Sequence, residues 1–116
     1  YEDLLLEWDE DNAGDWDADN LICKVRAWQT SDIGIGTIYS GNFEEALKSI
    51  KAKSILMPCT QDLYFPPEDN AIEASHMTHA EFRPFDSPWG HCAANPGNDS
   101  DFTQALEKSL QELLEY

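Results

Sequence analysis

The sequence predicts an α/β fold in which two parallel strands are flanked by helices. Along the 116 residues, stretches with helical hydrophobic spacing alternate with two short and continuous apolar runs. The resulting order of helix, strand, helix, strand and helix is typical of α/β proteins, in which helices cover the faces of a parallel sheet. The fold class therefore follows from the hydrophobic spacing within each segment and from the order of the segments along the chain.

The N-terminal third of the chain is expected to be helical after an acidic loop. Residues 1–20 are rich in acids and are predicted to form a solvated loop between two short helices. A helix is expected over residues 19–30, where apolar side chains recur at helical spacing: Leu21, Ile22, Val25 and Trp28. After a connection with several glycines, Asn42 is expected to cap a helix over residues 43–50, because its side-chain oxygen can accept from free backbone amides. The inner face of that helix would consist of Ala46, Leu47 and Ile50.

Two strands and two further helices are expected in the rest of the chain. Residues 54–57 have the form of a strand buried on both faces of a parallel sheet, and residues 80–85 have the form of a second strand. Pro66 and Pro67, followed by acids, favour a helix start between the strands. A last helix is expected over residues 101–115, with an apolar stripe on one face: Phe102, Leu106, Leu110, Leu113 and Leu114. Because sheets of two strands are marginal alone in water, we expect their missing neighbours to precede Tyr1.

Composition excludes several classes of partner. The chain has 23 acidic and 7 basic residues and a formal charge of -16, which disfavours nucleic acid and anionic membrane surfaces. No apolar run approaches the roughly 18 residues that a membrane span needs. Three widely separated cysteines, Cys23, Cys59 and Cys92, do not form the pattern of a disulfide framework. A reducing, cytoplasmic location is therefore expected.

No metal site is expected. His76 and His79 are spaced like metal ligands on one helical turn, but no third ligand is spaced to match them. Residues 9–20 partly match a calcium loop, yet Ala13 replaces an oxygen ligand and Asn20 stands where a bidentate glutamate belongs. The two histidines are therefore expected to be polar surface residues.

The residues with the clearest chemical pattern are Asp62 and His91. Asp62 follows the first predicted strand and His91 follows the second, and open α/β sheets place their ligands beyond the carboxyl ends of strands. An acyl-transfer triad needs an acid to orient an imidazole, and it needs a nucleophile beside that imidazole. No serine of the chain stands in a Gly-x-Ser-x-Gly context. We therefore predict a catalytic acid and base whose nucleophile these residues do not encode.

Several motifs carry a resemblance to a known family. Residues 50–68, with the block Asp-Leu-Tyr-Phe-Pro-Pro, and the turn Trp89-Gly90-His91 closely resemble the C-terminal part of the homoserine O-acetyltransferase family of α/β-hydrolase proteins. Residues 16–21 and 27–32 look like the end of the helical lid of that family. The resemblance implies that residues 1–42 form the end of a lid and a connection. Residues 43–116 would then form the C-terminal part of the α/β-hydrolase core.

The resemblance also implies an activity. A serine outside this chain would take an acetyl group from acetyl-CoA and pass it to the hydroxyl of a small molecule, while Asp62 orients His91 as general base and then acid. The chain itself would hold no bound cofactor and would be inactive alone. Here His91 is followed by Cys92-Ala93-Ala94, whereas acetyltransferases of the family usually continue Asp-Ala-Phe-Leu, so ester hydrolysis remains an alternative to acetyl transfer.

A non-catalytic role is the second alternative. A truncated α/β-hydrolase remnant could act as an interaction module that docks on another protein through its open strand edge and its acidic lid helix. In either case we expect a partner for the sheet, which would be the missing N-terminal half or a self-association partner.

Overall fold

The computed structural model describes residues 2–3, 17–95 and 97–115. The loop predicted over residues 1–20 and the partial calcium loop over residues 9–20 lie largely outside these described residues. The chain divides into two compact units, residues 1–32 and 33–116, and each is described by itself. The assignment of residues 1–42 to a lid and of residues 43–116 to a core stays a prediction.

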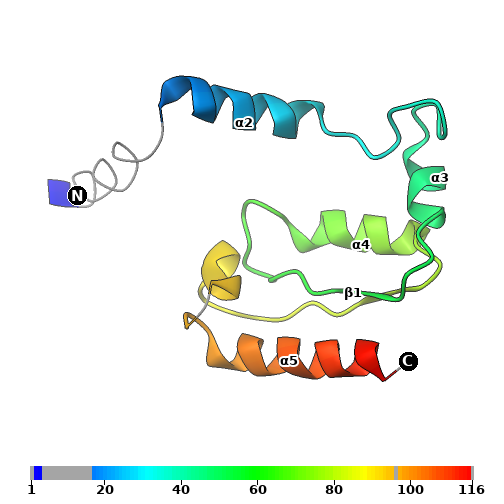
Figure 1. Ribbon diagram of the computed structural model, residues 1–116. Helices are drawn as coiled ribbons and strands as arrows, with labels where there is room; N and C mark the ends of the chain where they lie inside the picture. Colours follow the sequence, from blue (N-terminus) through cyan, green and yellow to red (C-terminus); the bar gives the residue numbers. More distant parts are fainter. Residues whose placement is uncertain (1, 4–16, 96, 116) are drawn as a thin grey trace. The chain divides into compact units, whose positions relative to one another are not determined.

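The first unit contains helix α2, Ala18–Thr30 (Figure 1). Its N-cap is Asp17, whose carboxylate accepts hydrogen bonds from the backbone and side-chain nitrogens of Asn20 at 2.9 and 3.2 Å, as acids at this position commonly do. At the other end, the hydroxyls of Thr30 and Ser31 bond back to carbonyls of the preceding turn. The helix expected over residues 19–30 is thus confirmed.

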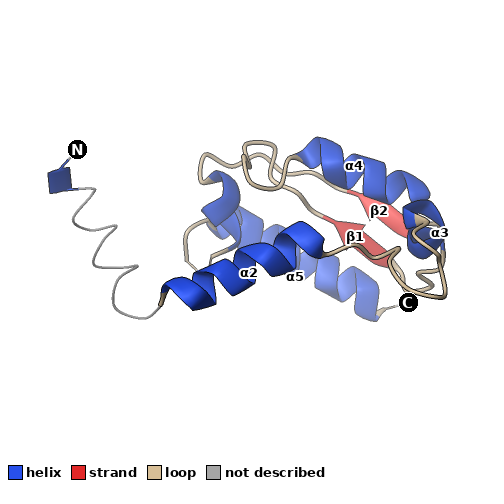
Figure 2. Ribbon diagram, turned by 90° about the horizontal axis from the view of Figure 1, so that it is seen from above, coloured by secondary structure: helices blue, strands red, loops and turns tan. Residues whose placement is uncertain are grey.

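The second unit contains the sheet. Strand β1, Ser54–Leu56, pairs in parallel with strand β2, Ala80–Phe82 (Figure 2). Both strands are shorter than predicted, because Pro58 has no N–H to donate to the neighbouring strand. The nitrogens of Arg83 and Phe85 donate toward β1, so the nitrogen of Pro84 between them faces away from the ladder. Pairing resumes beyond the prolines, where an isolated parallel bridge joins Cys59 to Phe85. The parallel pairing that the sequence predicts is therefore confirmed, and it extends to the residues that precede the candidate site.

Helices α4 and α5 lie on opposite sides of the strands (Figure 1). Helix α4, Pro67–His76, packs against β2 and begins with proline and two acids, as predicted. Helix α3, Phe43–Lys48, packs against α4 and is capped by Asn42, whose side-chain oxygen accepts from Glu45 N at 3.0 Å. Its inner face is confirmed for Ala46 and Leu47, which are buried. The helix ends two residues before the predicted limit at residue 50.

Two expectations about burial are wrong. Strand β1 is half-buried along its length instead of buried on both faces, because within the described residues it has one neighbouring strand only. In helix α5, Ser100–Leu114, the buried residue is Ser109, whereas Leu110 and Leu114 of the predicted apolar stripe are exposed. The hydroxyl of Ser109 is satisfied in its buried position, because it accepts from Arg83 at 2.9 Å and donates to the carbonyl of Ala105 at 2.8 Å.

The segment after β2 leads into a 3₁₀ helix, η1, which spans Gly90–Ala94 and packs against α5. His91 therefore lies in the first turn of a short helix. In the described parts of the chain, no helix combines the length and the apolar character needed to cross a membrane.

Candidate active site

The fold brings the two predicted site residues into direct contact. Nδ1 of His91 lies 3.0 Å from Oδ2 of Asp62, although the two residues are 29 positions apart. Asp62 follows β1 and His91 follows β2, and since the strands are parallel neighbours, their carboxyl ends lie at one edge of the sheet. The side chain of Asp62 is 11% exposed and that of His91 is 44% exposed. The acid is thus shielded while the imidazole faces outward.

The loop after β1 holds one oxygen of the Asp62 carboxylate. Its Oδ1 accepts from the backbone nitrogens of Tyr64 at 2.8 Å and Phe65 at 3.0 Å, a local bond pattern that Asp often makes in turns. Its Oδ2 is left for His91. Desolvation raises the pKa of Asp62, but the hydrogen bonds from Phe65 N, from His91 and from Tyr64 N outweigh it and hold the pKa below its ordinary value of 3.8. Asp62 is therefore ionised at neutral pH.

The charge of Asp62 fixes the tautomer of His91. A carboxylate can only accept hydrogen bonds, so Nδ1 of His91 donates to it and Nε2 is left with a lone pair when the ring is neutral. The rings of Tyr64 and Phe65 lie beside the imidazole, with centroid distances of 4.8 and 5.2 Å. The same dipeptide thus binds the carboxylate through its amides and confines the imidazole through its rings.

Gly90 is required for this arrangement. Its φ of +51° is in the left-handed region, and a Cβ at this position would come within 2.8 Å of the carbonyl oxygen of Gln61. The two loops therefore meet backbone to backbone one residue before both Asp62 and His91. This close approach is the physical reason for a glycine in the turn Trp89-Gly90-His91.

Further polar contacts join the two loops, and sequence reasoning missed them. The carboxylate of Asp86 accepts from the hydroxyl of Thr60 at 2.6 Å and from the side-chain amide of Gln61 at 3.2 Å. Ser87 is fully buried, and its hydroxyl bonds to Asp99 at the start of α5. The sequence before α5 contains a normal N-cap signal, but nothing in it indicates the contact with Ser87.

A depression of about 290 Å³ adjoins His91. Apolar and aromatic side chains dominate its lining, which consists of Gln61, Leu63, Tyr64, Pro88, Trp89, Gly90, His91 and Cys92. A proton acceptor beside a mostly apolar depression can activate a hydroxyl that is presented to it. Among the described residues, however, the side-chain hydrogen bond of His91 goes to Asp62, and none joins it to a serine.

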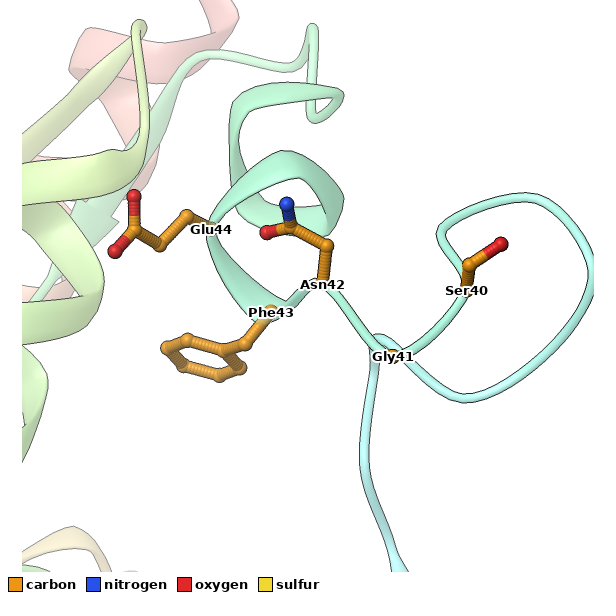
Figure 3. Close-up of a pocket in the computed structure, with 5 residues that line it drawn as sticks. All are labelled: Ser40, Gly41, Asn42, Phe43 and Glu44. Carbon is orange, nitrogen blue, oxygen red and sulfur yellow. The ribbon is translucent and has the colours of Figure 1, made fainter.

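A second depression, of about 580 Å³, lies at residues 40–44 (Figure 3). Two of its polar side chains are already engaged, since Asn42 caps α3 and the carboxylate of Glu44 faces His76 at 3.8 Å. None of the predicted site residues lines it.

The other residues that the sequence analysis weighed lie apart from one another. His76 is the last residue of α4, and His79 lies exposed just before β2. Among the described residues, no group of three or more potential ligands could hold a metal ion. Cys23, Cys59 and Cys92 are all free thiols, and Cys92 contributes to the depression beside His91.

Comparisons with known proteins give several partial relatives. The chain is 35% identical to an ethyl acetate hydrolase of Pseudomonas veronii over 84% of its length, and 30% identical to a probable esterase of Corynebacterium glutamicum over 85%. It is 33% identical to a homoserine O-acetyltransferase of Symbiobacterium thermophilum over 67% of its length. The aligned residues cover 27%, 28% and 21% of these relatives, so the chain spans about a quarter of their length.

No family model matches the chain, and no solved structure matches it significantly. The names of the three relatives all denote ester hydrolysis or acyl transfer. The likeness suggests a family of the α/β-hydrolase type, without singling out a member.

Proposed function

We propose that this chain is the C-terminal part of a serine esterase or acyltransferase with an α/β-hydrolase fold, and that Asp62 and His91 are two members of its catalytic triad. The observation that carries the proposal is the 3.0 Å contact between Nδ1 of His91 and Oδ2 of Asp62. This contact lies beyond the carboxyl ends of adjacent parallel strands, where α/β-hydrolases carry their acid and histidine. The likeness to esterases and to an acetyltransferase supports the same function.

The proposed reaction is acyl transfer through a covalent intermediate. Nε2 of His91 takes the proton of a serine hydroxyl from outside these 116 residues, and the serine oxygen attacks the carbonyl of an ester or thioester. His91 then returns the proton to the departing alcohol or thiol, which leaves an acyl-serine. Water or the hydroxyl of a small molecule attacks that acyl group, and His91 again takes and returns the proton. Throughout, ionised Asp62 stabilises the imidazolium and holds the ring in place.

The acyl donor is proposed to be either acetyl-CoA, a substrate that would not remain bound as a cofactor, or a simple ester. The depression beside His91 supports a small acyl or alcohol group, because it is small and mostly apolar. The strong negative charge of the chain supports a protein that does not associate with nucleic acid or anionic membranes. The three cysteines, which do not form a disulfide pattern, support a cytoplasmic location.

A second candidate function is that of a non-catalytic interaction module. It is supported by the large apolar side chains that unit 33–116 exposes, among them Leu63 at 92% and Leu114 at 85%. Exposed apolar surface of this kind usually marks a contact with another chain or segment. For the catalytic proposal, this partner would be the N-terminal half of the enzyme or a second copy of the chain.

The decisive experiment compares the 116-residue chain with the full-length protein encoded with the sequence upstream of Tyr1. Each is assayed for hydrolysis of p-nitrophenyl acetate and for acetyl transfer from acetyl-CoA to homoserine. We expect activity in the full-length protein only. We also expect a loss of kcat/KM of about 1,000-fold or more in His91→Ala and a large loss in Asp62→Asn. His79→Ala is the matched control, since His79 is exposed outside the site, and should stay within about twofold of the wild type.

Two results would contradict the proposal. If full-length His91→Ala keeps the wild-type kcat/KM, His91 is not the base. If the 116-residue chain alone turns over an ester and loses that activity on His91→Ala, the nucleophile lies within the chain. An upstream sequence without a Gly-x-Ser-x-Gly motif, together with an inactive full-length protein, would favour the interaction module.

A further inference from the structure

Ser87 is a buried polar residue that the proposed reaction does not use. It is 0% exposed, and its hydroxyl donates to Oδ2 of Asp99 at 2.5 Å and accepts from the backbone nitrogen of Trp89 at 3.2 Å. Its carbonyl accepts from the nitrogen of Gly90 at 3.2 Å and from the thiol of Cys59 at 3.5 Å. Ser87 therefore holds Trp89 and Gly90, the two residues directly before His91. It also contacts Cys59, which forms the isolated bridge beyond β1.

The two carboxylate oxygens of Asp99 accept hydrogen bonds from different parts of the chain. Its Oδ1 caps α5, because it accepts from the backbone nitrogens of Asp101 at 3.0 Å and Phe102 at 2.9 Å. Its Oδ2 accepts from Ser87. The hydrogen bond from Ser87, followed by the one from Phe102 N, lowers the pKa of Asp99 below its ordinary value, so this acceptor is charged at neutral pH. The turn before His91 is thus fastened to a 15-residue helix by a charge-assisted hydrogen bond.

The C-terminal part of η1 is also hydrogen-bonded to the residues just before α5. The side-chain amide of Asn98 donates to the carbonyl of Cys92 at 2.9 Å, and the backbone nitrogen of Asn98 donates to Asn95 O at 3.1 Å. His91 therefore lies in a 3₁₀ helix that is joined to the residues immediately before α5 through Ser87 at its start and directly through Cys92 and Asn95 toward its end. A short 3₁₀ helix has weak hydrogen bonds of its own, so its orientation depends on these external contacts.

We propose that Asp99, acting through the hydroxyl of Ser87, is a positioning residue that sets His91 against Asp62. This inference rests on the proposed function for its catalytic meaning, but the geometry that it concerns can be measured without catalysis. Positioning of this kind matters because a displacement of about 1 Å can cost an active site about 100-fold in rate.

The two oxygens of Asp99 bind different groups, so a substitution can remove the contact with Ser87 and keep the cap of α5. This makes the inference testable. In Asp99→Ser, the shorter side chain still serves as an N-cap for α5, since serine caps as well as aspartate, but it no longer reaches Ser87. Ser87→Ala removes the same hydrogen bond from the other side. Asp101→Asn is the matched control, because it removes a carboxylate from the same helical turn at an exposed position without touching Ser87.

The direct readout is the exchange of the Nδ1 proton of His91 with solvent, measured by NMR on the protein with its nitrogen atoms labelled. In the wild type this proton is held by Asp62 and should exchange slowly. We expect exchange at least tenfold faster in Asp99→Ser and Ser87→Ala, with unchanged far-UV circular dichroism, and a change below about twofold in Asp101→Asn. In the full-length enzyme, the same two variants should lower kcat more than they raise KM.

Unchanged proton exchange in Asp99→Ser would overturn the inference. If Ser87→Ala unfolds because it leaves a buried cavity, Asp99→Ser decides the question, since Asp99 is only half-buried and the helix keeps its cap. Failure of the proposed function would appear differently, as wild-type activity in His91→Ala. The two failures can therefore be told apart.

Discussion

Replacing Gly90 by alanine is expected to destabilise unit 33–116 through two separable effects. A residue with a Cβ in the left-handed region costs about 1 to 2 kcal/mol, and the φ of Gly90 is +51°. In addition, the new Cβ would lie 2.8 Å from the carbonyl oxygen of Gln61, which is backbone and cannot rotate away. Overpacking of this kind typically costs a further 1 to 3 kcal/mol, roughly. The total expected loss is about 2 to 5 kcal/mol.

Gly97 offers a matched control within the same unit. Its φ is +87°, also left-handed, but a Cβ there would meet nothing within 4 Å. Gly97→Ala should therefore carry the conformational cost alone, about 1 to 2 kcal/mol. The difference between the two variants isolates the contact between the loop that carries Asp62 and the turn that carries His91.

Urea denaturation, followed by far-UV circular dichroism at one fixed chain concentration, measures both free energies of unfolding. We expect Gly90→Ala to be less stable than Gly97→Ala by about 1 to 3 kcal/mol. It should also lose the slow exchange of the His91 Nδ1 proton, because His91 directly follows the displaced residue. Equal stability of the two variants would refute the close approach of Gly90 to Gln61.

Two further predictions concern pH and a helix cap. Because the folded pKa of Asp62 lies below its ordinary value of 3.8, the Asp62 contribution to stability should be complete above that value and be lost as pH falls through the lower folded pKa. Urea midpoints measured from neutral pH into this acid range should fall less steeply in Asp62→Asn, and identical slopes would contradict the assignment. Asn42→Ala should cost about 1 kcal/mol, because it removes the acceptor for Glu45 N at the start of α3, while Asn42→Ser should be nearly neutral in the same urea assay.

Local patterns in the sequence predict most of the elements. The helix over residues 18–30, the cap at Asn42 and the proline start of α4 all depend on nearby residues, so a single sequence contains the information for them. The predictions are wrong where contacts with residues far away in the sequence determine the local structure. Pro58 interrupts the ladder, as expected of a residue without N–H. That pairing resumes between Cys59 and Phe85, however, depends on the partner strand.

The burial of side chains was predicted less well than secondary structure, because burial depends on contacts with residues distant in the sequence. The spacing of leucines in α5 predicts an apolar inner face, yet Ser109 is the buried residue there, and Arg83 supplies a partner for its hydroxyl. A hydrophobic pattern shows which side chains gain from burial, whereas the neighbours that the fold provides determine which are buried.

The sequence by itself determined the α/β order, the parallel pairing and the positions of Asp62 and His91 after successive strands, because these follow from periodicity and from the motifs around each residue. Only the tertiary structure decided that the two side chains meet at 3.0 Å, and that Gly90, Ser87 and Asp99 hold them there. These contacts join residues far apart in the chain, and their energies depend on distance and orientation in three dimensions. A residue such as Asp99 has an ordinary cap signal in the sequence, and its second contact exists only because the fold brings Ser87 to it.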